Sequence, residues 1–263
     1  MRALITALPL IGMFTLNAQV DVNKLIQERM ARQQGGQAGD QGKVKIEDDT
    51  DPYVPNSFIG SFRMEMHHFQ NGTEEKSSPT TMRYWSKADM TVTKVELPDA
   101  KGRDMRMMTD LKNKWQYALV EDDKGKKTAI KTKKKKVVMD KNDEAGSAEV
   151  TVTKETKVID GHTCTKVISK SKEGTWTGWV AQDMPAPFDD MLRSVRSGDP
   201  SMTQRMAKVK GFPLEFEWVD ADGKSTMHCY MKEVVVGKVD DGVFSLDGYT
   251  VTDMTSMPDF GAH

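Results

Sequence analysis

Short runs in which apolar and polar residues alternate dominate the chain from Phe58 onward. In the first run, Phe62, Met64 and Met66 alternate with charged residues, which is the pattern of a β-strand with one buried face. Gly, Asn, Asp and Pro separate the runs, as they do at turns between successive strands. Further strands are expected at 80–86, 89–97, 103–109, 114–120, 126–139, 148–159, 163–169, 174–180, 211–219, 225–236 and 244–254.

Apolar residues recur at helical spacing in a few places. Residues 19–33 have the pattern of a short amphipathic helix, and residues 188–198 have that of a helix inserted between strands. A second helical turn is expected around Met202 and Met206. Together these patterns predict a mainly β (α+β) fold, a long antiparallel meander with one or two inserted helices.

The amino terminus has the order of a cleavable signal peptide. Arg2 precedes the apolar run Ala3–Leu16, and Ala18 offers a small residue for cleavage. The run is too short for a membrane span, which needs about 20 apolar residues. We therefore expect a signal peptide at 1–18, a periplasmic or secreted mature protein, and no transmembrane segment in the mature chain.

Two further segments complete the expected organisation. Residues 34–55 are rich in Gly, Gln and Asp and contain few apolar side chains, so they are expected to form a flexible linker. Residues 56–256 are expected to form a single β-rich domain.

Charge narrows the range of partners. The chain has 38 basic and 39 acidic residues and a net charge of -1, so it has no general attraction for nucleic acid, and no nucleic-acid partner is expected. One strong run of lysines comprises Lys126, Lys127, Lys131 and Lys133 to Lys136. The run could bind anionic lipid headgroups, or it could lie on an exposed edge strand whose charges discourage aggregation. We favour the edge strand.

Catalytic motifs are missing from the sequence. It contains no Gly-x-Ser-x-Gly elbow, no His-Glu-x-x-His and no phosphate-binding Gly-x-x-x-x-Gly-Lys. A non-enzymatic protein without a cofactor is therefore expected.

A cluster at Met64, Met66 and His68 is the sharpest candidate for metal binding. On a strand these three side chains share one face, and thioether and imidazole groups are ligands that suit copper. Methionine is also an ordinary filler of irregular cores, so core packing is the alternative.

A second candidate site is an apolar cavity for a lipid or acyl chain. The same side chains would also suit a plain packed core. The candidate residues are Trp115, Trp176, Trp179, Phe188, Met191, Leu192, Phe212, Phe216 and Trp218.

The two cysteines, Cys164 and Cys229, could form one disulfide outside the cytoplasm. Two buried thiols are the alternative.

Several segments resemble a known family. The stretch Phe58–Lys136, with Tyr84-Trp85 and Met107 to Leu111, and the stretch Glu155–Val167, followed by Thr177 to Asp183, are similar to exported bacterial proteins that share a domain of unknown function, number 4412. That family resembles the periplasmic lipoprotein carriers at the level of fold. The resemblance implies a strongly curved antiparallel sheet or half-barrel with inserted helices and an apolar concavity. It implies no catalytic residue.

These observations leave three hypotheses. The first is a protein that binds a hydrophobic ligand or lipid-like group in a sheet concavity. The second is a copper or other metal-handling protein that uses Met64 to His68. The third is an envelope interaction module whose helix at 19–33 docks an envelope protein.

Overall fold

The computed structural model describes residues 45–96, 104–138, 149–194 and 209–256. The expected signal peptide, the amino-terminal helix, the first part of the linker and the helical turn around Met202 and Met206 lie outside the described residues.

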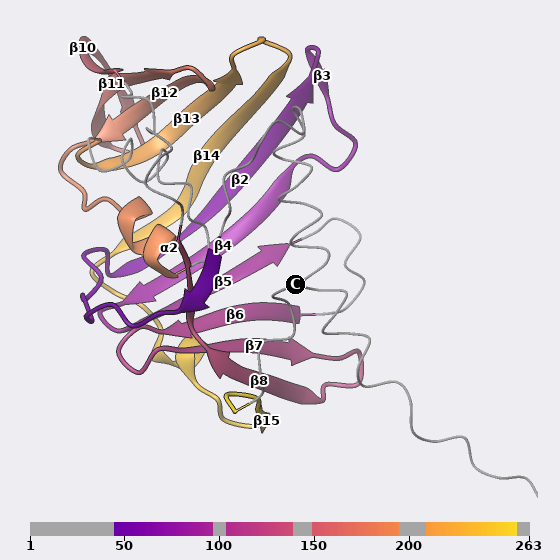
Figure 1. The fold of residues 1–263 in the computed structure, drawn as a ribbon. Helices are drawn as coiled ribbons and strands as arrows, with labels where there is room; N and C mark the ends of the chain where they lie inside the picture. Colours follow the sequence, from indigo (N-terminus) through magenta and orange to yellow (C-terminus); the bar gives the residue numbers. More distant parts are fainter. Residues whose placement is uncertain (1–44, 97–103, 139–148, 195–208, 257–263) are drawn as a thin grey trace, which may run out of the picture. The chain divides into compact units, whose positions relative to one another are not determined.

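One large sheet contains thirteen of the strands in the described part of the chain. These are β2 (Gly60–Gln70), β3 (Thr73–Glu74), β4 (Thr80–Lys87), β5 (Met90–Glu96), β6 (Asp104–Asp110), β7 (Trp115–Glu121), β8 (Lys127–Lys133), β10 (Glu149–Ile159), β11 (His162–Ser171), β12 (Gly174–Ala181), β13 (Phe212–Asp220), β14 (Ser225–Val236) and β15 (Thr250–Asp253). The order across the sheet is β10-β11-β12-β13-β14-β2-β4-β5-β6-β7-β8-β15, and β3 pairs with β2 (Figure 1). The sheet is open, because β10 and β15 do not pair with each other.

Two meanders joined side by side make up this sheet. Strands β4 to β8 form one and β10 to β14 form the other, and β2 lies between them because it pairs with both β4 and β14. A hairpin turn at Asp160-Gly161 joins β10 to β11, and both residues have positive φ, as a tight hairpin turn requires. The fold is therefore mainly β, as predicted.

The last strand corrects the prediction of a purely antiparallel sheet. β15 pairs with β8 in the parallel direction, so the sheet is mixed. The reason lies in the preceding segment, which contains the 3-10 helix η1 (Asp241–Phe244) and packs on a face of the sheet before it reaches β8.

The prediction of a flexible linker at 34–55 is wrong for the last part of that range. β1 (Lys45–Asp48) pairs with β9 (Lys135–Val138) in a separate two-stranded antiparallel sheet. The side chain of Asp49 is buried and accepts hydrogen bonds from Lys134 and Lys114, at 2.6 and 3.3 Å between Nζ and Oδ2. The acidic residues of this segment, which suggested a linker, are instead ion-pair partners of the lysine run.

A short helix, α2 (Phe188–Ser194), lies between β12 and β13 in the chain. Its Asp190 is fully buried, and Oδ2 accepts hydrogen bonds from the backbone N–H groups of Ser57 and Phe58 at 2.8 and 2.7 Å. These bonds fasten α2 to the segment that leads into β2, and the ring of Phe188 packs edge-on against Phe216 of β13.

Buried apolar side chains form two separate clusters. The larger cluster includes Phe58, Phe62, Tyr84, Phe212 and the α2 residue Phe188. The smaller cluster lies on β5 to β8 beneath the segment around η1, and it comprises Val92, Met108, Tyr117, Leu119, Ala129 and Phe244. The register assigns them to opposite faces of the sheet: Tyr84 belongs to the first cluster, whereas its neighbour in sequence, Trp85, pairs with Val92 of the second.

Candidate functional site

Strands β5 to β8 carry apolar side chains on both faces. On one face the smaller cluster is covered by the carboxy-terminal segment, in which Phe244 is buried and the Tyr249 hydroxyl accepts a hydrogen bond from Arg106 at 2.7 Å. An antiparallel sheet with one packed face commonly has a polar second face. Here the second face is mixed, with six apolar side chains among threonine and glutamine side chains such as Thr93 and Gln116.

We call this second surface the open apolar face, and it comprises Val95, Met105, Met107, Ala118, Val120 and Ile130. The register shows that its members share one side of the sheet, because Met107 pairs with Ala118, Ala118 pairs with Ile130, and Met105 pairs with Val120. Val95 and Met105 are 46% and 39% exposed, and the other four side chains are half-buried. Exposed apolar side chains that lie close together mark an interaction site more often than scattered single residues do.

Methionines extend the open apolar face toward β2 and β14. Met82 pairs with Val95 on one side and with Met64 on the other, and Met64 pairs with Met231 of β14. Met64 and Met231 are buried in the larger cluster, whereas Met82 is half-buried against it. The surface therefore runs continuously from a packed core to exposed side chains.

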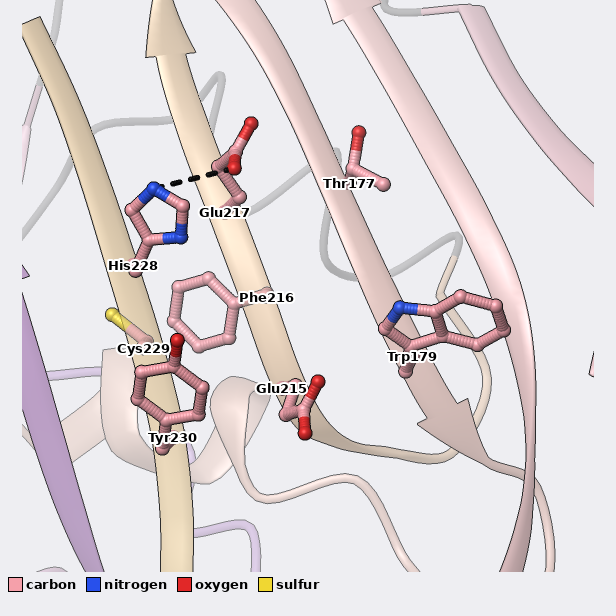
Figure 2. A pocket seen from close by; sticks show the side chains of 8 residues that line it. All are labelled: Thr177, Trp179, Glu215, Phe216, Glu217, His228, Cys229 and Tyr230. Atoms are coloured by element: carbon pink, nitrogen blue, oxygen red, sulfur yellow. Dashed lines mark ion pairs between the residues drawn. The ribbon is translucent and has the colours of Figure 1, made fainter. Parts of the chain in front are cut away.

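A pocket with a volume of about 190 Å³ lies on strands β12, β13 and β14. Figure 2 shows its lining side chains: Thr177, Trp179, Glu215, Phe216, Glu217, His228, Cys229 and Tyr230. Six of them belong to two rows of paired residues, Trp179 with Glu215 and Tyr230, and Thr177 with Glu217 and His228. Tyr230 in turn pairs with Glu65, which alternates with Met64 along β2, so these six lie on the face opposite to the methionines.

Charged groups of this pocket are largely paired within the protein. His228 Nε2 and Glu217 Oε2 are 3.3 Å apart, as the dashed line in Figure 2 marks. Lys157 forms an ion pair with Glu215, and its Nζ lies 4.7 Å from the ring centroid of Trp179. The ammonium group of Lys157 therefore already contacts one carboxylate and one aromatic ring that line the pocket.

The family model of a domain of unknown function, DUF4412, matches residues 58–247. The chain belongs to this family. The match confirms the resemblance seen in the sequence. No curated protein matches the chain.

Solved structures similar to this DUF4412 protein are distant from it. PNGF-II is 14% identical with a TM-score of 0.34, and the match covers 75% of this chain but only 32% of PNGF-II, so the chain spans about a third of that protein's length. The Mycobacterium tuberculosis lipoprotein LppX is 12% identical with a TM-score of 0.33, covering 69% of this chain and 89% of LppX. A putative outer membrane lipoprotein-sorting protein domain from Vibrio parahaemolyticus is 8% identical with a TM-score of 0.28, covering 84% and 95%. These similarities are too distant to transfer a ligand or an activity.

The residues predicted to line an apolar cavity fall in different places. Trp176, Phe188, Phe212 and Phe216 are buried in the larger cluster of the DUF4412 domain, and Trp179, Met191 and Trp218 pack against it. Trp115 instead packs against the smaller cluster, so the nine residues do not form one cavity lining. The side chain of Leu192 lies outside the described residues. Sequence reasoning missed the open apolar face, although the alternation of Met105, Met107 and their neighbours was visible.

The three predicted metal ligands share one face, as expected from a strand. Met64 is 7% exposed within the larger cluster, Met66 is half-buried against that cluster, and His68 is half-buried near the end of β2. The described ranges contain no group of three or more His, Cys, Asp or Glu side chains that could hold a metal ion. A metal site on β2 would therefore need methionine ligands.

Both cysteines are buried free thiols, so the possible disulfide is not formed. Cys164 lies on β11 and Cys229 on β14, with β12 and β13 between them. Three strand spacings amount to roughly 14 Å, whereas a disulfide needs Cα atoms about 4–7 Å apart.

The first strand of the lysine run, β8, is not an edge strand, whereas the second, β9, has a strand partner on one side only among the described residues. β8 pairs with β7 and β15, and β9 pairs with β1. Its lysines meet acidic partners, among them Lys131 with Asp253, Lys134 with Asp49, and Lys135 with Asp48. The run therefore holds strands together, which sequence reasoning missed because the acidic partners are distant in the chain.

Among the described residues, no helix has the length and apolar character needed to cross a membrane.

Proposed function

We propose that the protein is a non-enzymatic exported protein that holds a hydrophobic ligand, such as a lipid or acyl chain, on the open apolar face. One observation carries the proposal: strands β5 to β8 already have a packed apolar cluster on one face, yet their other face also carries six apolar side chains, among them the exposed Val95 and Met105. The order of residues at 1–18, with Arg2, an apolar run and Ala18, supports export.

The side chains of the open apolar face suit a flexible apolar ligand. Met105 and Met107 are unbranched and polarizable, and methionine is common on surfaces that adapt to varied apolar partners. Burying apolar surface contributes roughly 25 cal/mol per Å². An acyl chain that lies across several strands of this face would therefore be bound by the apolar surface that it buries, without a requirement for polar contacts.

A fluorescent fatty acid, 11-(dansylamino)undecanoic acid, tests the proposal on the mature chain that begins at Gln19. We expect saturable binding with a blue shift and an increase of dansyl emission. Met105→Asp places a carboxylate on the open apolar face and should weaken binding at least tenfold, about 1.4 kcal/mol, because that charge would lose water on binding.

Val251→Asp is the matched control. Val251 is 45% exposed, close to the exposure of Met105, but it pairs with Ala129 and so lies on the opposite face. Its binding should equal that of the unmodified protein, and circular dichroism should show both variants folded. Absence of saturable binding, or equal weakening by the two substitutions, would contradict the proposal.

A further inference from the structure

The pairing of β14 with β2 brings four soft donor groups together. Met66 lies directly opposite Cys229, and His68 lies directly opposite Met227. The two pairs are consecutive on the same face, since both strands advance by two residues between them. Side chains in directly opposed pairs have Cβ atoms roughly 5 Å apart, and same-face neighbours along a strand are roughly 7 Å apart. The four Cβ atoms therefore stand at the corners of a small rectangle.

From this arrangement we propose that Met66, Cys229, His68 and Met227 form a copper(I) site. The donor set contains two thioethers, one thiol and one imidazole, and soft sulfur ligands select copper in its lower oxidation state. None of the four side chains offers an oxygen ligand, which magnesium and calcium require. The site is separate from the proposed ligand surface on β5 to β8.

The surroundings suit a poorly hydrated, low-coordinate ion. Cys229 is 1% exposed, whereas Met66, His68 and Met227 are half-buried, so the thiol is the inner ligand and the other three form the entrance. The next pair along the strands, Met64 with Met231, is buried and apolar, and it closes the inner side. Met64 thus belongs to the wall of the site and not to its ligands.

Binding of copper(I) at Cys229 has a defined proton balance. Cys229 is a buried free thiol in the metal-free protein. When the copper–sulfur bond forms, the S–H bond breaks and the proton passes to solvent, with no change in the oxidation state of copper or sulfur. The site should therefore release one proton to solvent for each copper ion that it binds.

Anaerobic titration of the fully reduced mature chain with copper(I), in competition with bicinchoninate, tests the proposal. We expect one equivalent to bind, with thiolate-to-copper absorption in the near ultraviolet. Cys229→Ser should weaken binding at least a hundredfold and abolish the absorption. Met66→Leu, which preserves size and apolar character, should weaken it about tenfold.

Matched controls separate ligation from packing. Cys164→Ser changes the other buried thiol, which is on β11, and Met108→Leu changes a buried methionine of the smaller cluster, on the opposite face of the sheet. Both variants should retain the affinity and the absorption. The proposal fails if the unmodified protein does not compete with bicinchoninate, if Cys164→Ser loses as much affinity as Cys229→Ser, or if Met66→Leu leaves binding unchanged.

Discussion

His67 lies between two carboxylates on the polar side of β2. Its Nε2 is 3.0 Å from Oε1 of Glu65, and its Nδ1 is 2.7 Å from Oε1 of Glu74. The hydrogen bond with Glu65 raises the pKa of His67, burial opposes this, and the bond with Glu74 raises it further. The charged imidazole is therefore favoured in the folded protein.

We expect the stabilising effect of His67 to depend on pH. Because the folded pKa is raised, the contribution is complete below the unfolded pKa of about 6.5 and is lost as pH rises through the folded value. His67→Gln should lower the free energy of unfolding by about 0.5–1 kcal/mol at pH 5.5 and by less at pH 9. Urea denaturation of both proteins at the two pH values measures this.

His162→Gln provides the control for the His67 prediction. His162 has Asp183 as a carboxylate partner, at 2.9 Å, and the Asp183 side chain is 62% exposed. Its substitution should change stability less than that of His67 at pH 5.5. If the loss of unfolding free energy in His67→Gln stays constant or grows toward pH 9, the stabilising contact of a charged His67 with Glu65 and Glu74 is contradicted.

Among the elements, β1 depends on charges that come from distant parts of the chain. Asp49 follows β1, and the side chains of Asp49 and Lys134 are only 6% and 8% exposed. Burial alone would raise the pKa of Asp49, but hydrogen bonds from Lys134, the backbone of Asp51 and Lys114 outweigh it and lower the pKa. The carboxylate form of Asp49 is therefore favoured in the folded protein.

Asp49→Asn should lower the free energy of unfolding by about 3 kcal/mol at pH 7, because it leaves the buried Lys134 without its nearest carboxylate. Since the folded pKa of Asp49 is lowered, its contribution is present above the unfolded pKa of about 3.9 and disappears as pH falls through the folded value. The difference between variant and unmodified protein should therefore shrink toward pH 2.5 in thermal unfolding experiments.

Asp51→Asn is the control for this element. Asp51 contacts Lys136 at 2.6 Å but its side chain is 64% exposed, so its removal should cost less than about 0.5 kcal/mol. Equal effects of the two substitutions would show that burial of the Asp49 pair does not matter.

Strands with a clear two-residue period were predictable, and β2, β4 and β7 lie close to their expected ranges. The expected strands at 148–159 and 163–169 also match β10 and β11, which the Asp160-Gly161 turn joins. β1 was missed because a short acidic strand has the composition of a linker. Its strand partner is β9, about ninety residues away in the chain, where Lys135 and Lys136 lie opposite the acidic Asp48 and Glu47.

At the scale of the whole molecule, the two apolar clusters lie on opposite faces of one sheet, so they should contribute to stability independently. Phe212→Leu and Leu119→Ala remove buried groups from the larger and the smaller cluster respectively. Leu119→Ala should cost about 3 kcal/mol. The double variant should lose the sum of the two single effects to within about 0.5 kcal/mol, measured by denaturation in guanidinium chloride.

Phe58→Leu combined with Phe212→Leu gives the contrasting case. These rings lie in one cluster with centroids 5.5 Å apart, so their effects should deviate from additivity by more than about 0.5 kcal/mol. An equally large deviation from additivity for Leu119→Ala combined with Phe212→Leu would contradict the independence of the two clusters.

The open apolar face was not predicted as a site, and of the soft donors only Met66 and His68 were candidates from the sequence. Both depend on which strands are neighbours, and the decisive pairing, β14 with β2, joins Cys229 to Met66 across more than 160 residues. Alternation along a single strand shows which side chains share a face. It does not show what stands opposite them.

The separation of the two thiols has a practical consequence for making the protein. Because Cys164 and Cys229 lie on β11 and β14 with two strands between them, the native state contains no cross-link that an oxidising compartment must supply. We expect the mature chain to reach the same structure when it is synthesised in a reducing cytosol. Such a preparation would keep both sulfurs as thiols from the outset.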